Sequence, residues 1–141
     1  MKILIDADAC PVRQIVEQEA RERAVKVLLI ADSSHNMKGG YGIPVTVDKG
    51  ADSADLALIN MAQRGDLVVT QDYGVAALAL GKGLRAIHQS GMRYTDDNID
   101  ALLAERCLAK KARLAGKRPS GRLKKRSRAE DEAFRSSFVQ L

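Results

Sequence analysis

Short apolar runs alternate along the chain with segments in which apolar residues recur every three or four positions. Ile3-Leu4-Ile5 predicts a buried strand, and the segment opened by Pro11 predicts a helix from its apolar residues at helical spacing. Further strands are predicted at 25–30, 45–47, 67–70 and 84–88, and further helices at 52–64, 75–82, 95–116 and 130–139.

Two of these helices carry specific expectations. Thr95 is placed to cap the helix that follows it, and this helix should present one apolar face made of Ile99, Leu102, Leu103 and Leu108. The last helix should pack Phe134 and Phe138 against the body of the protein.

The predicted strands are continuously apolar and alternate with helices. Strands of this kind are typical of a parallel sheet that is covered on both faces, so we expect a three-layer α/β/α fold with a mainly parallel central sheet. Right-handed crossovers place the loops that follow the strands at one edge. In open sheets of this kind, binding sites lie outside the carboxyl ends of the strands.

The length of 141 residues suits one domain. We expect an α/β domain over 1–116, a basic linker or arm over 117–128, and a C-terminal helix at 129–141 that packs on the same domain. The two cysteines, Cys10 and Cys107, are too few for a disulfide framework and form no zinc motif, which favours a reducing, cytoplasmic setting. No signal peptide or membrane span is expected, because the apolar runs are too short.

Charge is unevenly distributed along the chain. The formal net charge is +5, yet residues 106–128 contain 11 basic and no acidic residues, which leaves 12 basic and 18 acidic residues, a net −6, in the rest of the chain. The sequence therefore predicts an acidic body joined to a strongly basic segment.

Five aspartates come from three segments that the predicted fold brings to one sheet edge. Two follow the first strand, two lie at the start of the central helix and one follows the strand at 67–70: Asp6, Asp8, Asp52, Asp55 and Asp72. Carboxylates that converge repel one another and shift their pKa values, unless they stay hydrated or hold cations. Mg²⁺ or Mn²⁺, as one or two ions, is the natural partner of such a set.

Helix capping is the competing interpretation for three of these residues. Asp8, Asp52 and Asp72 each precede or open a predicted helix and could serve as N-caps, whereas Asp6 ends a strand and is not placed to cap. Cys10 is interpreted as a packed residue, and His35 and His88 receive no role because neither has metal-ligand spacing to a second histidine.

The motifs at 6–11, 50–55, 65–72, 91–95 and 98–99 resemble the YaiI/YqxD family, an uncharacterised bacterial family also known as UPF0178 or DUF188. The resemblance covers residues 1 to 116. That family is regarded as similar to PIN-like domains, which are α/β nucleases with an acidic metal site. The resemblance implies that Asp6, Asp55 or Asp52, and Asp72 match the metal-binding acids, with Asp8 as an additional carboxylate.

The sequence departs from the family pattern at a few positions. Ser53 follows Asp52 where an apolar residue is commoner, and Tyr73-Gly74 follows Asp72 where an apolar residue and a proline are expected. None of these departures changes a carboxylate.

The basic segment is a candidate nucleic-acid contact, because several cations together can neutralise phosphates. The segment contains no aromatic residue, so it offers no base stacking of its own. A solvated arm without a specific partner is the alternative. The candidate contacts are Lys110, Lys111, Arg113, Lys117, Arg118, Arg122, Lys124, Lys125, Arg126 and Arg128.

Three functions remain open from the sequence. The first is a hydrolase, a ribonuclease that depends on Mg²⁺ or Mn²⁺, with Asp6, Asp55 and Asp72 as primary ligands and RNA or another nucleic acid as partner. The second is a non-catalytic module that binds RNA or the ribosome and keeps a structural metal pocket. The third is a phosphatase of the haloacid-dehalogenase type, suggested by Asp6-x-Asp8, although the order of the other motifs argues against it.

Overall fold

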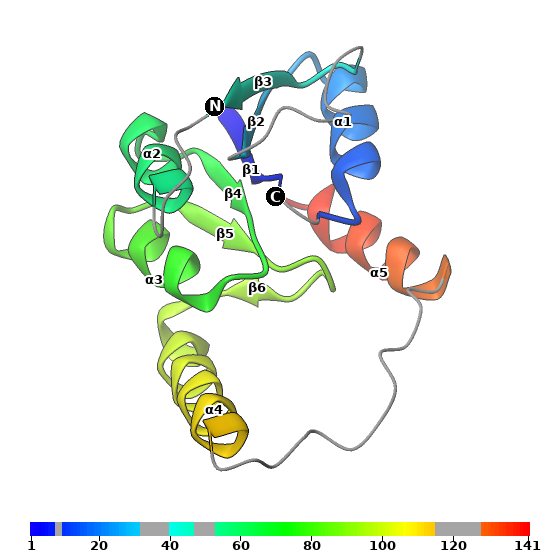
Figure 1. Ribbon diagram of the computed structural model, residues 1–141. Helices are drawn as coiled ribbons and strands as arrows, with labels where there is room; N and C mark the ends of the chain where they lie inside the picture. Colours follow the sequence, from blue (N-terminus) through cyan, green and yellow to red (C-terminus); the bar gives the residue numbers. More distant parts are fainter. Residues whose placement is uncertain (8–9, 32–39, 47–52, 115–127) are drawn as a thin grey trace.

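The computed structural model (Figure 1) describes residues 1–7, 10–31, 40–46, 53–114 and 128–141, with the side chains of 53–55, 106, 109, 110 and 112–114 outside the description. The elements in chain order are β1 (Lys2–Asp6), α1 (Arg13–Glu22), β2 (Lys26–Ala31), β3 (Ile43–Thr46), α2 (Ser53–Met61), β4 (Leu67–Val69), α3 (Tyr73–Gly81), β5 (Arg85–Ile87), β6 (Arg93–Tyr94), α4 (Asp96–Leu114) and α5 (Arg128–Phe138).

The six strands form one sheet in the order β3-β2-β1-β4-β5-β6. The first five are parallel, and β6 joins the edge antiparallel to β5. Ile5 in the central strand β1 lies beside Leu29 of β2 on one side and Val69 of β4 on the other. Figure 1 shows α1 and α5 on one face of the sheet and α2, α3 and α4 on the other. The predicted three-layer α/β/α fold is confirmed.

Each face of the sheet has its own core, because successive side chains of a strand point to opposite faces. Ile3 and Ile5 of β1 belong to the core under α1 and α5. Leu4 of the same strand belongs to the core under α2 and α3, together with Leu58 and Val75. The continuous apolar character of the strands thus reflects burial on both sides.

Helix α4 begins as the sequence predicts. Thr95 Oγ1 accepts a hydrogen bond from Asn98 N at 3.2 Å, and Asn98 Oδ1 accepts one from Thr95 N at 2.9 Å, which closes the first turn reciprocally. Ile99 is buried, and Leu102 and Leu103 pack partly against the core. The prediction was wrong for Leu108, which is 66% exposed, because nine residues after Ile99 place it about 180° around the helix, on the opposite side of α4. Figure 1 shows α4 running out beyond the edge of the sheet.

Helix α5 is built into the core. Phe134 is fully buried, and its ring stacks on Phe138 with centroids 5.5 Å apart. Ser137 Oγ donates to the backbone oxygen of Gly91 at 2.5 Å, in the turn between β5 and β6. The C-terminal helix is therefore fixed both to the sheet face and to the β5–β6 hairpin.

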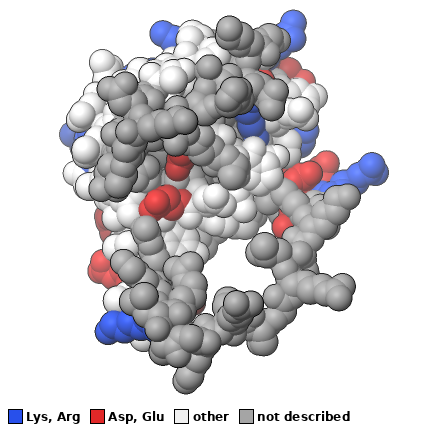
Figure 2. All heavy atoms as spheres, viewed as in Figure 1, with Lys and Arg blue, Asp and Glu red and all other residues white. Residues whose placement is uncertain are grey.

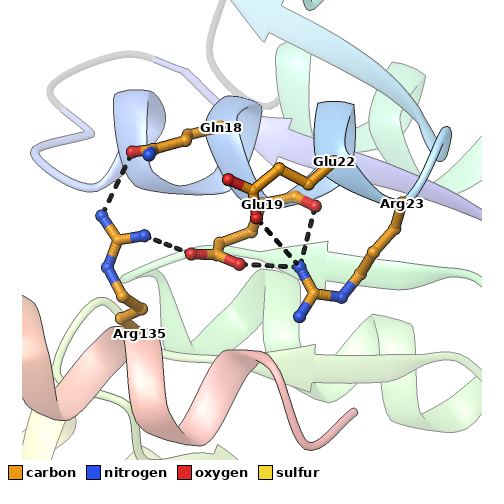
Figure 3. A network of polar contacts seen from close by, with 5 residues as sticks. All are labelled: Gln18, Glu19, Glu22, Arg23 and Arg135. Atoms are coloured by element: carbon orange, nitrogen blue, oxygen red, sulfur yellow. Dashed lines mark hydrogen bonds and ion pairs between the residues drawn. The ribbon is translucent and has the colours of Figure 1, made fainter.

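A buried carboxylate ties α5 to α1 (Figure 3). Glu19 of α1 accepts hydrogen bonds from Arg135 of α5 and from Arg23, the latter at 2.7 Å. Arg135 also donates to Gln18 Oε1 at 3.3 Å. Burial raises the pKa of Glu19, but the hydrogen bonds and charges of Arg23 and Arg135 outweigh burial and leave the pKa below its ordinary value.

A second buried carboxylate fixes the amino edge of the sheet. Asp66 accepts hydrogen bonds from Lys2 Nζ at 2.7 Å and from the backbone N–H groups of Lys2 and Gln63 at 3.1 and 2.8 Å. Burial raises the pKa of Asp66, and these hydrogen bonds lower it further than burial raises it. The N-terminus of β1 is thereby held to the turn that precedes β4.

We predict that the free energy of unfolding decreases as the pH falls below the ordinary pKa of these two carboxyl groups. A group whose pKa is lower in the folded chain stabilises the fold fully above its unfolded-state pKa, and this contribution is lost as the pH falls through the folded-state pKa. Urea denaturation measured from about pH 7 to about pH 3 checks this.

The matched variant is Asp66→Asn, which we expect to cost about 1–3 kcal/mol at neutral pH through its weakened hydrogen bonds to Lys2. This variant should also lose less of its free energy of unfolding than the wild type as the pH falls from about 7 to about 3. The control is Asp97→Asn, which changes an exposed carboxylate. If the double variant Glu19→Gln/Asp66→Asn loses as much unfolding free energy on acidification as the wild type, these two carboxylates are not the cause of the pH dependence.

Candidate functional site

The order of the strands reverses between β1 and β4. From β1 the chain continues through β2 and β3 on one side, and β4 and β5 lie on the other. In an open parallel sheet the crevice outside the carboxyl ends at such a reversal is where ligands bind. Asp6 is the last residue of β1, and Asp72 follows β4, so both lie at this point of the sheet.

Thr70, the residue directly after β4, connects the two strand ends. Its hydroxyl donates to Asp6 Oδ2 at 3.2 Å and accepts from the backbone N–H of Asp72 at 3.0 Å. Thr70 is 3% exposed, and its backbone N–H donates to Ile87 O at 3.1 Å. One buried side chain thus orients the carboxylate of Asp6 and the chain at Asp72.

Asp72 is also the N-cap of α3. Its Oδ1 atom accepts hydrogen bonds from Gly74 N at 2.8 Å and Val75 N at 3.3 Å. The capping interpretation is confirmed for this residue. Both bonds use the same carboxylate oxygen.

Asp6 is not the N-cap residue of α1, as the sequence predicts. The N-cap position of α1 is Val12, which makes no side-chain capping hydrogen bond. A hydrogen bond to Asp6 comes from Thr70, which lies 64 positions along the chain. This arrangement places Asp6 in the tertiary structure of the strand ends.

The other predicted metal ligands are only partly located. Asp55 lies in α2 with its side chain outside the description, and Asp8 and Asp52 lie outside the described residues. Within the described part of the chain, no three His, Cys, Asp or Glu side chains come together in a way that could hold a metal ion. Asp6 and Asp72 are the two candidate carboxylates that the structure places at the reversal point. Figure 2 shows several acidic side chains, in red, on the face of the molecule turned toward the viewer.

Only some of the predicted nucleic-acid contacts lie in the part of the chain that the structure describes. Lys111 at the end of α4 and Arg128 at the start of α5 are exposed. Lys110 and Arg113 lie in α4 with undescribed side chains. The remaining six lie outside the described residues: Lys117, Arg118, Arg122, Lys124, Lys125 and Arg126.

Three aromatic side chains, which we call the ring cluster, were missed as site residues. Tyr73, His88 and Tyr94 have ring centroids 6.0 to 6.3 Å apart in every pairing. Tyr94 is buried, and its hydroxyl donates to Thr70 O at 3.1 Å. Burial, followed by the nearby Tyr73 and Asp72, raises the pKa of Tyr94, so the phenol stays protonated as a donor.

No spacing in the sequence indicates the ring cluster, because its members come from α3, the end of β5 and β6. For Thr70 the sequence offers only a weak signal, because it is a hydroxyl residue at the end of an apolar run. Cys10, in contrast, packs half-buried against the core, as predicted.

Among the described residues, no helix combines the length and apolar character needed to cross a membrane.

The matches to known proteins all lead to the same family. The model of the family described as "Uncharacterized BCR, YaiI/YqxD family" matches residues 4–141, so the match extends beyond residue 116, where the sequence resemblance was placed, and includes α5. A UPF0178 protein of Ruminiclostridium cellulolyticum is 52% identical over 99% of this chain and 90% of its own length. UPF0178 proteins of Clostridium acetobutylicum and Lachnoclostridium phytofermentans are 51% and 47% identical over all of this chain and 96% of their own lengths. No solved structure matches the chain significantly.

Proposed function

Since this chain belongs to the YaiI/YqxD family, which is described only as uncharacterised, we propose its function from its own residues: it is a PIN-like, divalent-metal-dependent ribonuclease. The observation that carries this proposal is the placement of Asp6 and Asp72 at the carboxyl ends of two adjacent strands where the strand order reverses.

The hydrogen bonds at the strand ends support the proposal. Thr70 orients Asp6 through its Oδ2 atom, and the capping bonds hold the carboxylate of Asp72 through Oδ1. Fixed carboxylate oxygens on separate elements are what a Mg²⁺ site requires, because Mg²⁺ is commonly held by one or two carboxylates together with water and substrate phosphates.

In this proposal Asp6, Asp55 and Asp72 are the primary ligands, and Asp8 and Asp52 supply further carboxylates. The bound Mg²⁺ or Mn²⁺, as one or two ions, would lower the pKa of a coordinated water and stabilise the charge that develops on the phosphodiester. The basic residues of 106–128, of which Lys111 and Arg128 are described and exposed, would hold the RNA backbone.

Replacing Asp6 or Asp72 by asparagine tests the site. Each variant should lose Mn²⁺-dependent cleavage of single-stranded RNA by about 100-fold or more, since a catalytic metal contributes several kcal/mol of charge stabilisation. Asparagine caps helices about as well as aspartate, so Asp72→Asn should keep α3 intact, whereas Asp72→Ala should also cost about 1 kcal/mol in stability.

The control is Asp97→Asn, which neutralises an exposed carboxylate in the first turn of α4. Cleavage by equally purified Asp6→Asn protein at the wild-type rate would refute the proposal. Calorimetric titration with Mn²⁺ separates loss of metal from loss of chemistry.

A second candidate is a non-catalytic RNA-binding module with a structural metal pocket. The capping by Asp72 favours it, because that carboxylate already has a structural function. RNA binding that persists in chelator, without cleavage in Mg²⁺ or Mn²⁺, would favour this candidate over the nuclease.

A further inference from the structure

The ring cluster lies at the same carboxyl edge of the sheet as Asp6 and Asp72. Tyr73 is the residue after Asp72, and His88 directly follows β5. Tyr94 bonds to the backbone oxygen of Thr70, whose hydroxyl bonds to Asp6. A continuous chain of contacts therefore joins the rings to the carboxylates.

Each ring is held in place by its own element. Tyr73 is the first residue of α3, whose start is fixed by the two capping bonds of Asp72. His88 Nδ1 accepts a hydrogen bond from Ser90 N at 3.0 Å, and the backbone N–H of His88 donates to Met92 O at 2.8 Å. Tyr94 is anchored through its hydroxyl, so the three rings are positioned before any ligand arrives.

The three rings differ in exposure. Tyr94 is 4% exposed and forms the base of the cluster, whereas Tyr73 and His88 are half-buried and reach the surface. Nδ1 of His88 accepts the bond from the backbone N–H of Ser90, so the neutral ring carries its proton on Nε2. The surface part of the cluster thus consists of two half-buried aromatic rings.

We infer that Tyr73 and His88 form a stacking subsite for an unpaired nucleobase beside the Asp6–Asp72 site. Aromatic faces stack on any base, and a base that is paired within a duplex cannot reach them. The inference rests on the proposed function, which places nucleic acid at this edge, and it narrows the substrate class to single-stranded segments. It also supplies the base contact that the basic segment, without an aromatic residue, lacks.

Binding in chelator tests this subsite separately from catalysis. The probes are a short single-stranded oligonucleotide that carries 2-aminopurine, whose emission decreases on stacking, and a hairpin duplex of the same composition. Tyr73→Ala should weaken binding of the single strand about tenfold and abolish the fluorescence decrease, whereas Tyr73→Phe should retain both. Binding of the duplex should be weak and the same for all variants.

Tyr41→Ala is the matched control, because Tyr41 is an exposed tyrosine that precedes β3 and bonds to Val25 O, near the opposite ends of the strands. If Tyr73→Ala is unstable on thermal denaturation, Tyr73→Leu keeps the apolar volume without the aromatic face and should show the same loss of binding. Unchanged binding by both Tyr73 variants, an equal loss in Tyr41→Ala, or wild-type protein that binds no single strand would overturn the inference.

The two proposals fail in different ways. Single-strand binding that depends on Tyr73, without metal-dependent cleavage, would refute the nuclease and leave the stacking subsite. Cleavage that depends on Asp6 but is indifferent to Tyr73 would refute the subsite and leave the nuclease.

Discussion

The Phe134→Ala variant is expected to lose about 3–5 kcal/mol of unfolding free energy, the usual cost of removing a fully buried phenylalanine. Phe134 is 0% exposed, lies in the core with Ile3 and Ile5 of the central strand, and stacks on Phe138. Its removal would leave a cavity between α5 and the sheet. Urea denaturation followed by circular dichroism measures the loss.

Leu108→Ala is the matched control for this variant. Leu108 is a large apolar residue in α4 but is 66% exposed, so its truncation should change stability by less than about 0.5 kcal/mol. A loss below about 1 kcal/mol for Phe134→Ala would show that α5 contributes little to the folded core.

Replacing Gly91 by alanine is expected to undock α5 and to cost about 3 kcal/mol or more, similar to Phe134→Ala. Gly91 has φ +92°, and a Cβ atom there would lie 2.9 Å from Ala133 O and 3.2 Å from Phe134 Cα. These are backbone atoms of α5 and cannot move aside alone. The hydrogen bond from Ser137 to Gly91 O would be lost with them.

Gly65→Ala separates the two causes of this effect. Gly65 has φ +94°, nearly the same as Gly91, yet a Cβ atom at Gly65 meets nothing within 4 Å. It should therefore cost only the backbone strain, about 1–2 kcal/mol. Equal losses in the two variants would mean that contact with α5 does not account for the requirement for glycine at position 91.

The fold was largely predictable because the pattern of apolar residues within each short segment indicates whether that segment is a strand or a helix. Continuous apolar runs such as Ile3-Leu4-Ile5 are buried on both faces, and their alternation with helical segments determines a parallel sheet. The short strand β6 was missed, since two residues show no periodicity. Leu108 was misplaced because a spacing of nine residues from Ile99 puts it on the opposite side of α4, not on the same face.

The candidate site was less predictable, because its contacts are made between distant elements. The positions of Asp6 and Asp72 at strand ends followed from the pattern, whereas the shared contact with Thr70 depends on the register of β1 and β4. Tyr73, His88 and Tyr94 meet only when β5 and β6 form a hairpin beside α3. His88 in particular has no sequence neighbour that indicates its environment.

The docking of α5 has a consequence for the basic segment. Residues 115–127 join α4 to α5 and form the tether by which the docked helix α5 stays connected to the rest of the domain. This tether carries much of the positive charge of the chain. Closing such a loop costs only about 0.6 kcal/mol for each doubling of its length. The length of the tether can therefore vary at little entropic cost to folding.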